Sequence, residues 1–450
     1  MTRRTLLFCA PLLLICAGPC GGQEAKSPEP RRIALDEAVE LALKHNHVVR
    51  IAAYSVEEKK HSKDIARSAY FPLLRNDSNV AQLTDTQFIG IPAGSLGTVG
   101  GTPIPEQAAV VNQGALTILT SGTQLTQPLS ELWKVKSAND VARAEFDETR
   151  SKARQTENEV ALKVHQLYYR ILILQSHKEA ALAKIQASEA LQTERMQQVK
   201  FGSTLEEEAI ESRAQSLESK QDLLTTDLQL SDFTMQLNDA IGLPLTTPLV
   251  LDTAVRQVGS TCDREQCLRV AEESHPEIAE ARAQVEQATA AVRLAKRQYI
   301  PDIEAFARYS FQNNVPFLVH NFGTFGVHFG YDLFDGGRRN AAIAEREAQL
   351  HKAEENLARV KEEVELRVQT AYNKLERTRQ MMKVSEQLLA LRTESHRVSV
   401  QQVQEGSALR SQADMTAARE LEAKAMFLQS QLEYIQANDE MTEAMGQTPE

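Results

Sequence analysis

The sequence predicts a mainly α-helical protein with some β-structure, in which one unit of long helices and a β-hairpin occurs twice. One repeated motif is Tyr70-Phe71-Pro72, which returns as Tyr299-Ile300-Pro301 after 229 residues (301 − 72). Another is Phe201-Gly202-Ser203, which returns as Glu405-Gly406-Ser407 after 204 residues (406 − 202). Long stretches consist of Ala, Glu, Gln, Leu, Lys and Arg, a composition typical of long helices and coiled coils. Repetition in this order indicates a pseudo-symmetric molecule and not two unrelated domains.

Composition and charge limit the classes of partner and chemistry. The chain has 450 residues, 42% of them apolar, and a formal net charge of −11. Nucleic acid is therefore not an expected partner, because phosphate binding needs a basic surface. The sequence contains no His-Glu-x-x-His, Gly-x-Ser-x-Gly or Cys-x-x-Cys motif, so it predicts no enzyme activity and no cofactor. His45 and His47 point different ways on a helix, which disfavours a metal site.

Residues 1–22 have the features of a signal peptide. Arg3 and Arg4 precede an apolar run from Leu6 to Ala17 that is too short to span a bilayer. We expect cleavage near Gly22 and export of the mature chain. Lipid attachment at Cys20 is an alternative, although Pro19 is unfavourable just before such a processing site.

The first repeat covers residues 31–242. It begins with a helix over 34–69, for which Asp36 is the expected N-cap and which Pro72 ends. A β-hairpin over about 72–129 follows, with a Gly- and Pro-rich loop at 90–105. This hairpin is expected from the symmetry of the repeat, because its own alternation of apolar and polar residues is weak.

A very long helix comes next, since residues 133–200 contain neither Gly nor Pro. At 1.5 Å per residue such a helix is roughly 100 Å long. It carries a heptad seam formed by Val160, Val164, Leu167, Ile171 and Leu174. Gly202 ends the helix, and a returning helix over 205–240 is lined by Leu217, Leu224, Leu228 and Met235. These helices must pack against one another, because a single helix cannot bury its own apolar residues.

A linker over 243–262 leads to the second repeat, residues 263–447, with a hairpin over about 301–334, a long helix to Glu405 and a returning helix over 409–444. In this hairpin Phe325, Val327 and Phe329 alternate with polar or small residues, and so do Ala305, Ala307 and Tyr309. This pattern is typical of transmembrane barrel strands. A soluble sheet with one buried face gives the same alternation, but the flanking helices offer no core to cover it.

The order and duplication of these parts resemble the TolC-like outer-membrane efflux proteins over about residues 31–447. The matching segments are Ala34-Leu35-Asp36-Glu37-Ala38, His275-Pro276-Glu277-Ile278, Leu333-Phe334-Asp335-Gly336-Gly337 and the two glycine turns. The first repeat departs from the pattern, with Leu129-Ser130-Glu131-Leu132-Trp133 in place of the Asp-Gly-Gly turn. This departure leaves the corner after its hairpin in doubt.

The resemblance implies a homotrimer in outer-membrane lipid, with a 12-stranded transmembrane β-barrel continued by a periplasmic α-helical barrel. A four-stranded sheet has two unpaired edges, which hydrocarbon does not tolerate, so copies of the chain must close it. The implied function is a passive exit channel of a tripartite efflux or type I secretion system, working with a periplasmic adaptor (membrane fusion) protein and an inner-membrane transporter. The alternative is a structural coiled-coil protein of the periplasm or surface. Cargo stays open between drugs, metal ions and protein.

The resemblance also suggests working residues. Docking of the adaptor is expected at the two helix tips, formed by Phe201, Gly202 and Ser203 and by Glu405, Gly406 and Ser407. Their alternative role is helix capping alone. The family narrows its bore with acidic residues about two turns beyond the tip, which makes Glu208, Glu211, Gln412 and Asp414 the gate candidates. Acidic residues at this place also compensate the helix dipole without any gating role.

Two cysteines follow the signal peptide, Cys262 and Cys267. In an oxidising compartment they form either a small local disulfide or two unpaired thiols at the start of a helix. Without further Cys or His residues nearby they are poor metal ligands.

Overall fold

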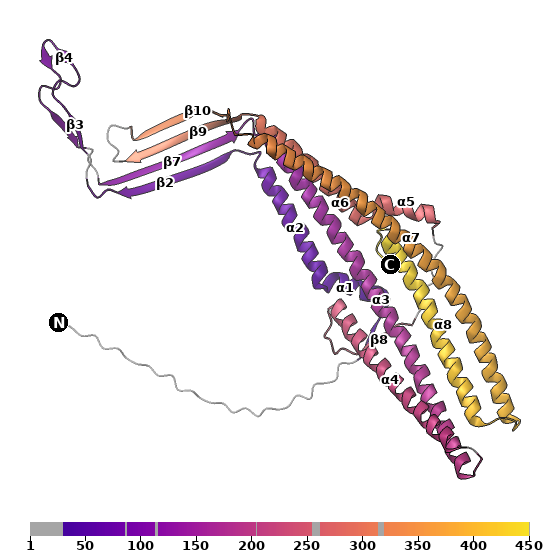
Figure 1. Ribbon diagram of the computed structural model, residues 1–450. Helices are drawn as coiled ribbons and strands as arrows, with labels where there is room; N and C mark the ends of the chain where they lie inside the picture. Colours follow the sequence, from indigo (N-terminus) through magenta and orange to yellow (C-terminus); the bar gives the residue numbers. More distant parts are fainter. Residues whose placement is uncertain are drawn as a thin grey trace, which may run out of the picture.

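The structure is a computed structural model that describes residues 30–85, 88–112, 116–203, 205–253, 262–313 and 319–449. The expected signal peptide with Cys20, and most of the linker from residue 254 on, lie outside the described residues. The molecule is elongated, with a β-sheet at one end and the turns of two long helical hairpins at the other (Figure 1). The predicted fold class, mainly α with β in a duplicated unit, is confirmed.

Each repeat contributes two short helices, a hairpin and two long helices, in the same order. The first consists of β1 Arg31–Ile33, α1 Leu35–His45, α2 His47–Ser68, β2 Leu73–Gln82, β3 Phe88–Ile91, β4 Thr98–Val99, β5 Thr102–Pro103, β6 Ala109–Asn112, β7 Thr117–Pro128, α3 Leu132–Lys200 and α4 Glu206–Ile241. The second consists of β8 Leu249–Leu251, α5 Arg264–Ser274, α6 Pro276–Lys296, the 3₁₀-helix η1 Arg297–Tyr299, β9 Asp302–Asn313, β10 Asn321–Gly330, α7 Arg338–Gln404 and α8 Arg410–Ala444.

The prediction of one uninterrupted helix over 34–69 is wrong, because the chain breaks at Asn46. This residue has an extended backbone, and its side chain accepts a hydrogen bond of 2.9 Å from the Val48 N–H, which caps α2. His275 does the same between α5 and α6, where its Nδ1 accepts from the Glu277 N–H at 3.2 Å. Asp36 is not the N-cap of α1 but lies in its first turn. A polar cap thus redirects the chain at the same place in both repeats.

The loop predicted at 90–105 is more regular than expected. It contains the antiparallel pairs β3–β6 and β4–β5, which extend beyond the ends of β2 and β7, away from the helices (Figure 1). The second repeat has no described counterpart to these strands.

The two larger hairpins join into one antiparallel sheet, ordered β10-β9-β7-β2, with β10 and β2 at its edges. Directly paired residues share a face. One side, here called the apolar face, carries Phe325, Val327 and Phe329 paired with Ala307, Ala305 and Ile303. The opposite side, the polar face, carries a row formed by Arg75, Gln124, Arg308 and Thr324. The alternation predicted for the second hairpin is present in the register.

Phe306 interrupts the predicted alternation, and the structure gives the reason. It pairs with Gly326, where an added Cβ atom would be 3.2 Å from the edge of the Phe306 ring. The glycine therefore makes room for an aromatic ring on the polar face. The strand β10 ends at Gly330, four residues before the predicted end of the hairpin.

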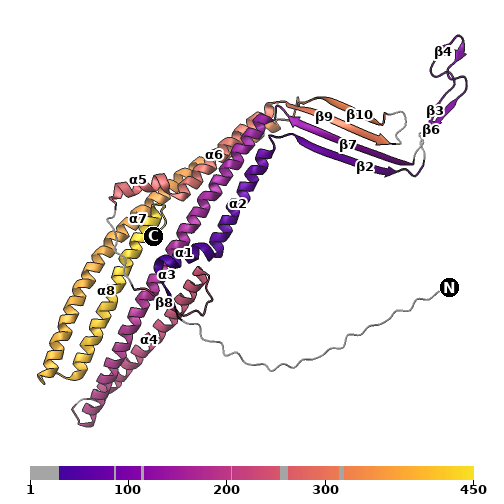
Figure 2. The ribbon, with the colours of Figure 1, turned by 180° about the vertical axis from the view of Figure 1, so that it is seen from behind.

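The helices lie side by side below the sheet, in the order α7, α8, α3 and α4 (Figure 2). Two buried clusters hold them together, one around Val164, Leu237 and Leu432 and one around Val364, Val368 and Met441. The short strands β1 and β8 pair in parallel beside α3, where the Tyr168 hydroxyl donates to the carbonyls of Ile33 and Asp252. Burial raises the pKa of Tyr168 to about 12. In the described ranges no helix is both long enough and apolar enough to cross a membrane.

Candidate functional site

The tip of the first repeat is a tight helical reversal built around Gly202. The Ser203 N–H donates to the Gln198 carbonyl at 2.9 Å, and the Gly202 N–H donates to the Val199 carbonyl at 3.0 Å. These two bonds form a Schellman motif, which requires a left-handed residue at its centre. Gly202 supplies it with a φ of 69°. The tip is therefore held by its backbone and leaves its side chains free.

The tip of the second repeat has the same backbone. The Ser407 N–H donates to Gln402 at 2.9 Å, the Gly406 N–H donates to Val403 at 3.1 Å, and Gly406 has a φ of 72°. Both serine hydroxyls also donate to the same carbonyl as their N–H, at 3.0 Å. The repetition seen in the sequence thus corresponds to one turn geometry used twice.

The side chains at the two tips differ. Phe201 is 86% exposed, whereas the matching position holds Glu405. Three glutamates open α4, but Arg410 opens α8. Both tips still present an exposed leucine just before the returning helix, Leu205 and Leu409. The tips therefore share an apolar contact point and differ in charge.

The structure does not bring the four gate candidates together within one chain. Glu208 forms an ion pair of 3.0 Å with Arg195 of α3 and is half exposed. Glu211 and Gln412 are exposed, and Asp414 is half-buried. The ion pair turns Glu208 toward its own helical hairpin, so this residue has a structural contact in addition to its predicted role.

The leucines predicted to line the returning helix are not buried in the chain. The face of α4 that lies against α3 is formed by small polar residues, Ser212, Ser216 and Ser219, all of them buried. Leu224 is 70% exposed, and so are most of its apolar neighbours along the helix. α4 therefore has an apolar stripe that no described part of the chain covers, formed by Ile210, Leu217, Leu224 and Leu228.

α7, at the opposite side of the molecule, carries a matching stripe. Its exposed apolar residues include Val384, Leu391 and Val398. Counted from Gly202 or Gly406, the stripes contain the matched pairs Ile210 and Val398 at 8 residues (210 − 202, 406 − 398), Leu217 and Leu391 at 15 (217 − 202, 406 − 391), and Leu224 and Val384 at 22 (224 − 202, 406 − 384). A seven-residue spacing is that of a coiled-coil seam. Sequence reasoning noted the α4 residues but not this correspondence.

The α7 stripe borders a groove of about 530 Å³ between α7 and α8, lined among others by Met381, Val384 and Leu388. The groove has the shape that a further helix needs for packing, because ridges of one helix fit between two others. Within one chain no helix occupies it.

A buried polar contact joins the two repeats. His165 of α3 lies 2.7 Å from Asp439 of α8, measured from Nδ1 to Oδ2, and the Tyr169 hydroxyl donates to the same carboxylate oxygen at 3.3 Å. His165 and Asp439 are almost fully buried. Below this contact, toward the tips, a cavity of about 480 Å³ separates α3, α4 and α8. The repeats are therefore closely joined in the middle and more loosely packed near the tips.

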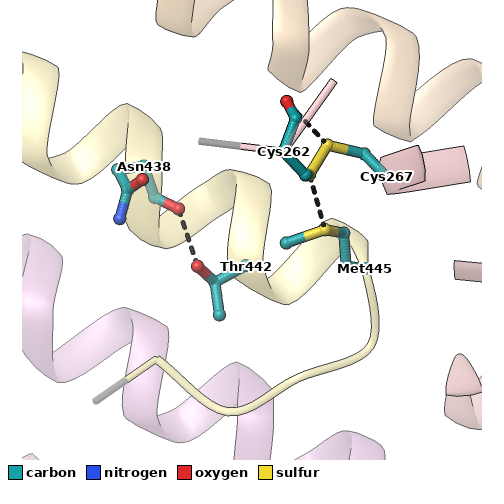
Figure 3. The surroundings of a disulfide bond; sticks show 5 residues. All are labelled: Cys262, Cys267, Asn438, Thr442 and Met445. Carbon is teal, nitrogen blue, oxygen red and sulfur yellow. Dashed lines mark hydrogen bonds between the residues drawn. A yellow bond between two sulfur atoms is a disulfide. The ribbon is translucent and has the colours of Figure 1, made fainter. Parts of the chain in front are cut away.

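Cys262 and Cys267 are bonded to each other, with a Cα–Cα distance of 5.7 Å (Figure 3). The Cys262 sulfur also lies 3.6 Å from the Met445 sulfur, so the disulfide contacts the end of α8 (Figure 3). In the parts of the chain that the structure describes, no group of three or more His, Cys, Asp and Glu residues is arranged to hold a metal ion.

Residues 267–447 match the family model described as Outer membrane efflux protein. This segment covers nearly all of the second repeat. The match confirms the predicted resemblance and the outer-membrane location that the family description names. None of the curated proteins matches the sequence.

Solved structures match most of the chain. The CmeC outer membrane channel of Campylobacter jejuni has a TM-score of 0.74 and 14% identity, covering 92% of this chain and 85% of that chain. A membrane protein from Pseudomonas aeruginosa has a TM-score of 0.74 and 16% identity, covering 92% and 93%. The MtrE outer membrane channel of Neisseria gonorrhoeae, in its open state, has a TM-score of 0.71 and 15% identity, covering 92% and 89%. At these identities the likeness shows a common fold.

Proposed function

We propose that three copies of this chain form a passive exit channel, with a 12-stranded barrel in the outer membrane and a helical tunnel in the periplasm. The observation that carries the proposal is that the chain is unfinished on both sides. On one side lie the sheet edge β10 and the apolar stripe of α7, and on the other lie the edge β2 and the stripe of α4. Two different surfaces of this kind fit head-to-tail assembly into a closed ring.

The matched spacing of the stripes supports the pairing of α4 with α7 of the next copy. α4 runs away from its tip and α7 runs toward its own, so the two helices are antiparallel. α3 and α7 have 69 and 67 residues and both start at the sheet, which favours tips at similar depth. The three pairs then lie opposite each other, and the stripe of α4 covers the groove beside α7. The number of copies comes from the family resemblance.

We further propose that the tips dock to a periplasmic adaptor that links the channel to an inner-membrane transporter, in an efflux or type I secretion system. The exposed apolar side chains of Phe201, Leu205 and Leu409 support this, because exposed apolar groups on a rigid turn mark contact sites. The different charges of the two tips would allow a partner to distinguish them. Neither feature selects a cargo.

Cysteine cross-linking tests the assembly. Leu224→Cys combined with Val384→Cys is expected to give covalent dimers and trimers on mild oxidation, because the two positions face each other across the subunit boundary. The matched control, Leu224→Cys with Leu391→Cys, is displaced by two turns, or about 10 Å, and should cross-link poorly. Equal cross-linking of both pairs, or none of the first, would contradict the arrangement.

Conductance of the purified protein in planar lipid bilayers tests the channel itself. Stable single-channel steps are expected from the trimer. A cross-linked trimer that never conducts would favour the alternative, a structural coiled-coil protein without channel activity.

A further inference from the structure

The polar face of the sheet carries an arrangement that neither the repeat nor the proposed assembly requires. Arg308 lies in the middle of β9 and pairs with Gln124 of β7, which in turn pairs with Arg75 of β2. Two arginines thus belong to one row across the sheet. The apolar face is the one that suits hydrocarbon, so this row faces the lumen of the proposed barrel.

The side chain of Arg308 lies across β7 and covers Gly122. A Cβ atom at Gly122 would be 2.8 Å from Nη2 and 2.9 Å from Nε of Arg308. Gly122 is buried on a sheet whose polar face is otherwise open, and its φ is not left-handed. The glycine is therefore needed for space, because only its bare backbone lets the guanidinium lie flat on the strand.

The charges around this position do not cancel. Gly122 pairs with Asp77 of β2, and the Asp77 carboxylate accepts a hydrogen bond of 3.0 Å from Nε of Arg75. Asp77 is thus neutralised by Arg75. Among the described residues no carboxylate lies within ion-pair distance of Arg308. The four residues Arg75, Asp77, Gly122 and Arg308, here called the Arg308 cluster, therefore carry one excess positive charge per chain.

We propose that the Arg308 cluster recognises oxyanions in the barrel lumen, so that the outer-membrane part of the channel favours cargo with carboxylate or phosphate groups. A guanidinium presents parallel N–H donors that match two oxygens of such a group. Threefold repetition places three clusters at the same height, and a narrow lumen concentrates their field. This inference rests on the proposed function, since it requires the polar face to line a pore.

Bilayer recordings across a potassium chloride gradient test the inference, with inorganic phosphate as the oxyanion probe. Arg308→Gln is expected to lower the permeability ratio of chloride to potassium by about twofold or more and to weaken the block of the current by phosphate. Arg308→Lys keeps the charge but not the paired donors, so it should preserve the reversal potential and weaken only the block.

Gly122→Ala provides a steric test in which no charge changes. The added methyl group displaces the guanidinium, so phosphate block should weaken as it does in Arg308→Lys. Gly323→Ala is the matched control, because it adds the same methyl group on the apolar face, where the nearest atom is 4.0 Å away. It should behave like the wild type.

The outcomes separate this inference from the proposed function. A conducting Arg308→Gln trimer with the reversal potential and phosphate block of the wild type would overturn the Arg308 cluster alone. A wild-type trimer that does not conduct at all would overturn the channel, and the cluster's role with it. Trimer formation on native gels shows in each case that the variant has assembled.

Discussion

The hairpins of the two repeats lie side by side in one sheet, yet their apolar faces have different chemistry. On β10 this face carries Phe325, Val327 and Phe329, all strongly exposed in the single chain. On β2 and β7 it carries hydroxyl and amide groups, Asn76, Ser78, Ser121 and Thr123, between apolar residues at both ends. The same backbone register thus supports two side-chain solutions to one environment.

The polar group on the first hairpin is internally satisfied. The Asn76 amide donates to the hydroxyls of Ser121 and Thr123 at 3.2 and 2.8 Å. Ser78 lies 2.8 Å from both the Asn76 carbonyl oxygen and the Ser121 hydroxyl. Polar side chains that bond one another lose much less on transfer to hydrocarbon than isolated ones. The comparison teaches that a strand facing lipid needs either apolar residues or polar residues with partners.

The joints between the helices sharpen the comparison of the repeats most strongly. Gly446 has a φ of 79°, and a Cβ atom there would lie 2.5 Å from the His275 Cα. Gly446→Ala should therefore lower the free energy of unfolding by about 3 kcal/mol, from the left-handed backbone and from overlap with a main chain that cannot move aside. The measurement is thermal unfolding of the detergent-solubilised protein.

Gly242 is the matched position in the first repeat, where the added Cβ would meet the side chain of His45 at 2.7 Å instead. A side chain can move, so Gly242→Ala should cost less. At the tip Gly406 has no atom within 4 Å of an added Cβ, and Gly406→Ala should cost only about 1 kcal/mol. Equal losses in all three variants would contradict the role assigned to these contacts.

The polar group on β2 and β7 allows a direct test of the first comparison. Simple alternation predicts that Asn76→Leu stabilises the protein, because it replaces an amide with an apolar side chain on the apolar face. The hydrogen bonds predict the opposite, a loss of about 1–2 kcal/mol, because the Thr123 hydroxyl loses its partner. Melting temperatures in detergent distinguish the two. Val80→Leu, on the same face without such bonds, should be nearly neutral.

The sequence predicted the duplicated elements well, because their signals are local or periodic. The glycine tips, the absence of Gly and Pro in α3 and α7, and the alternation on β10 each follow from a physical preference of the backbone or side chains. The break at Asn46 was missed because a single polar residue inside a helical pattern gives little signal. His275, followed by Pro276 at the matched place, was the available clue.

The candidate site was less predictable, because it depends on which helix faces are left uncovered. Leu224 in the sequence reads as part of an inner seam, and only the packing of Ser216 against α3 shows that it points outward. The Arg308 cluster gave no sequence signal at all. Its residues come from three strands, and the role of Gly122 appears only when the register is known.

The smallest expected effect concerns the caps that break the first helix of each repeat, Asn46 and His275. Burial lowers the pKa of His275 below its ordinary value of 6.5, opposed by the nearby Glu277 carboxylate and assisted by Arg367. The folded protein therefore favours the neutral ring, which accepts the Glu277 N–H. The unfolded chain binds the proton more readily, so the stabilisation is present above pH 6.5 and is lost as the pH falls through the folded-state pKa.

His275→Asn places the cap of the first repeat into the second. It should keep the stability of the wild type at pH 8 and lose less of it below pH 6.5, because an amide does not titrate. His275→Ala removes the cap and should cost about 1 kcal/mol at pH 8. The measurement is the difference in melting temperature between variant and wild type at each pH, since Glu280 and Glu443, whose pKa values burial raises, titrate in both proteins. A difference that stays constant from pH 8 to pH 5 would show that His275 does not change its protonation in the fold, and that the two caps are equivalent in charge as well as in geometry.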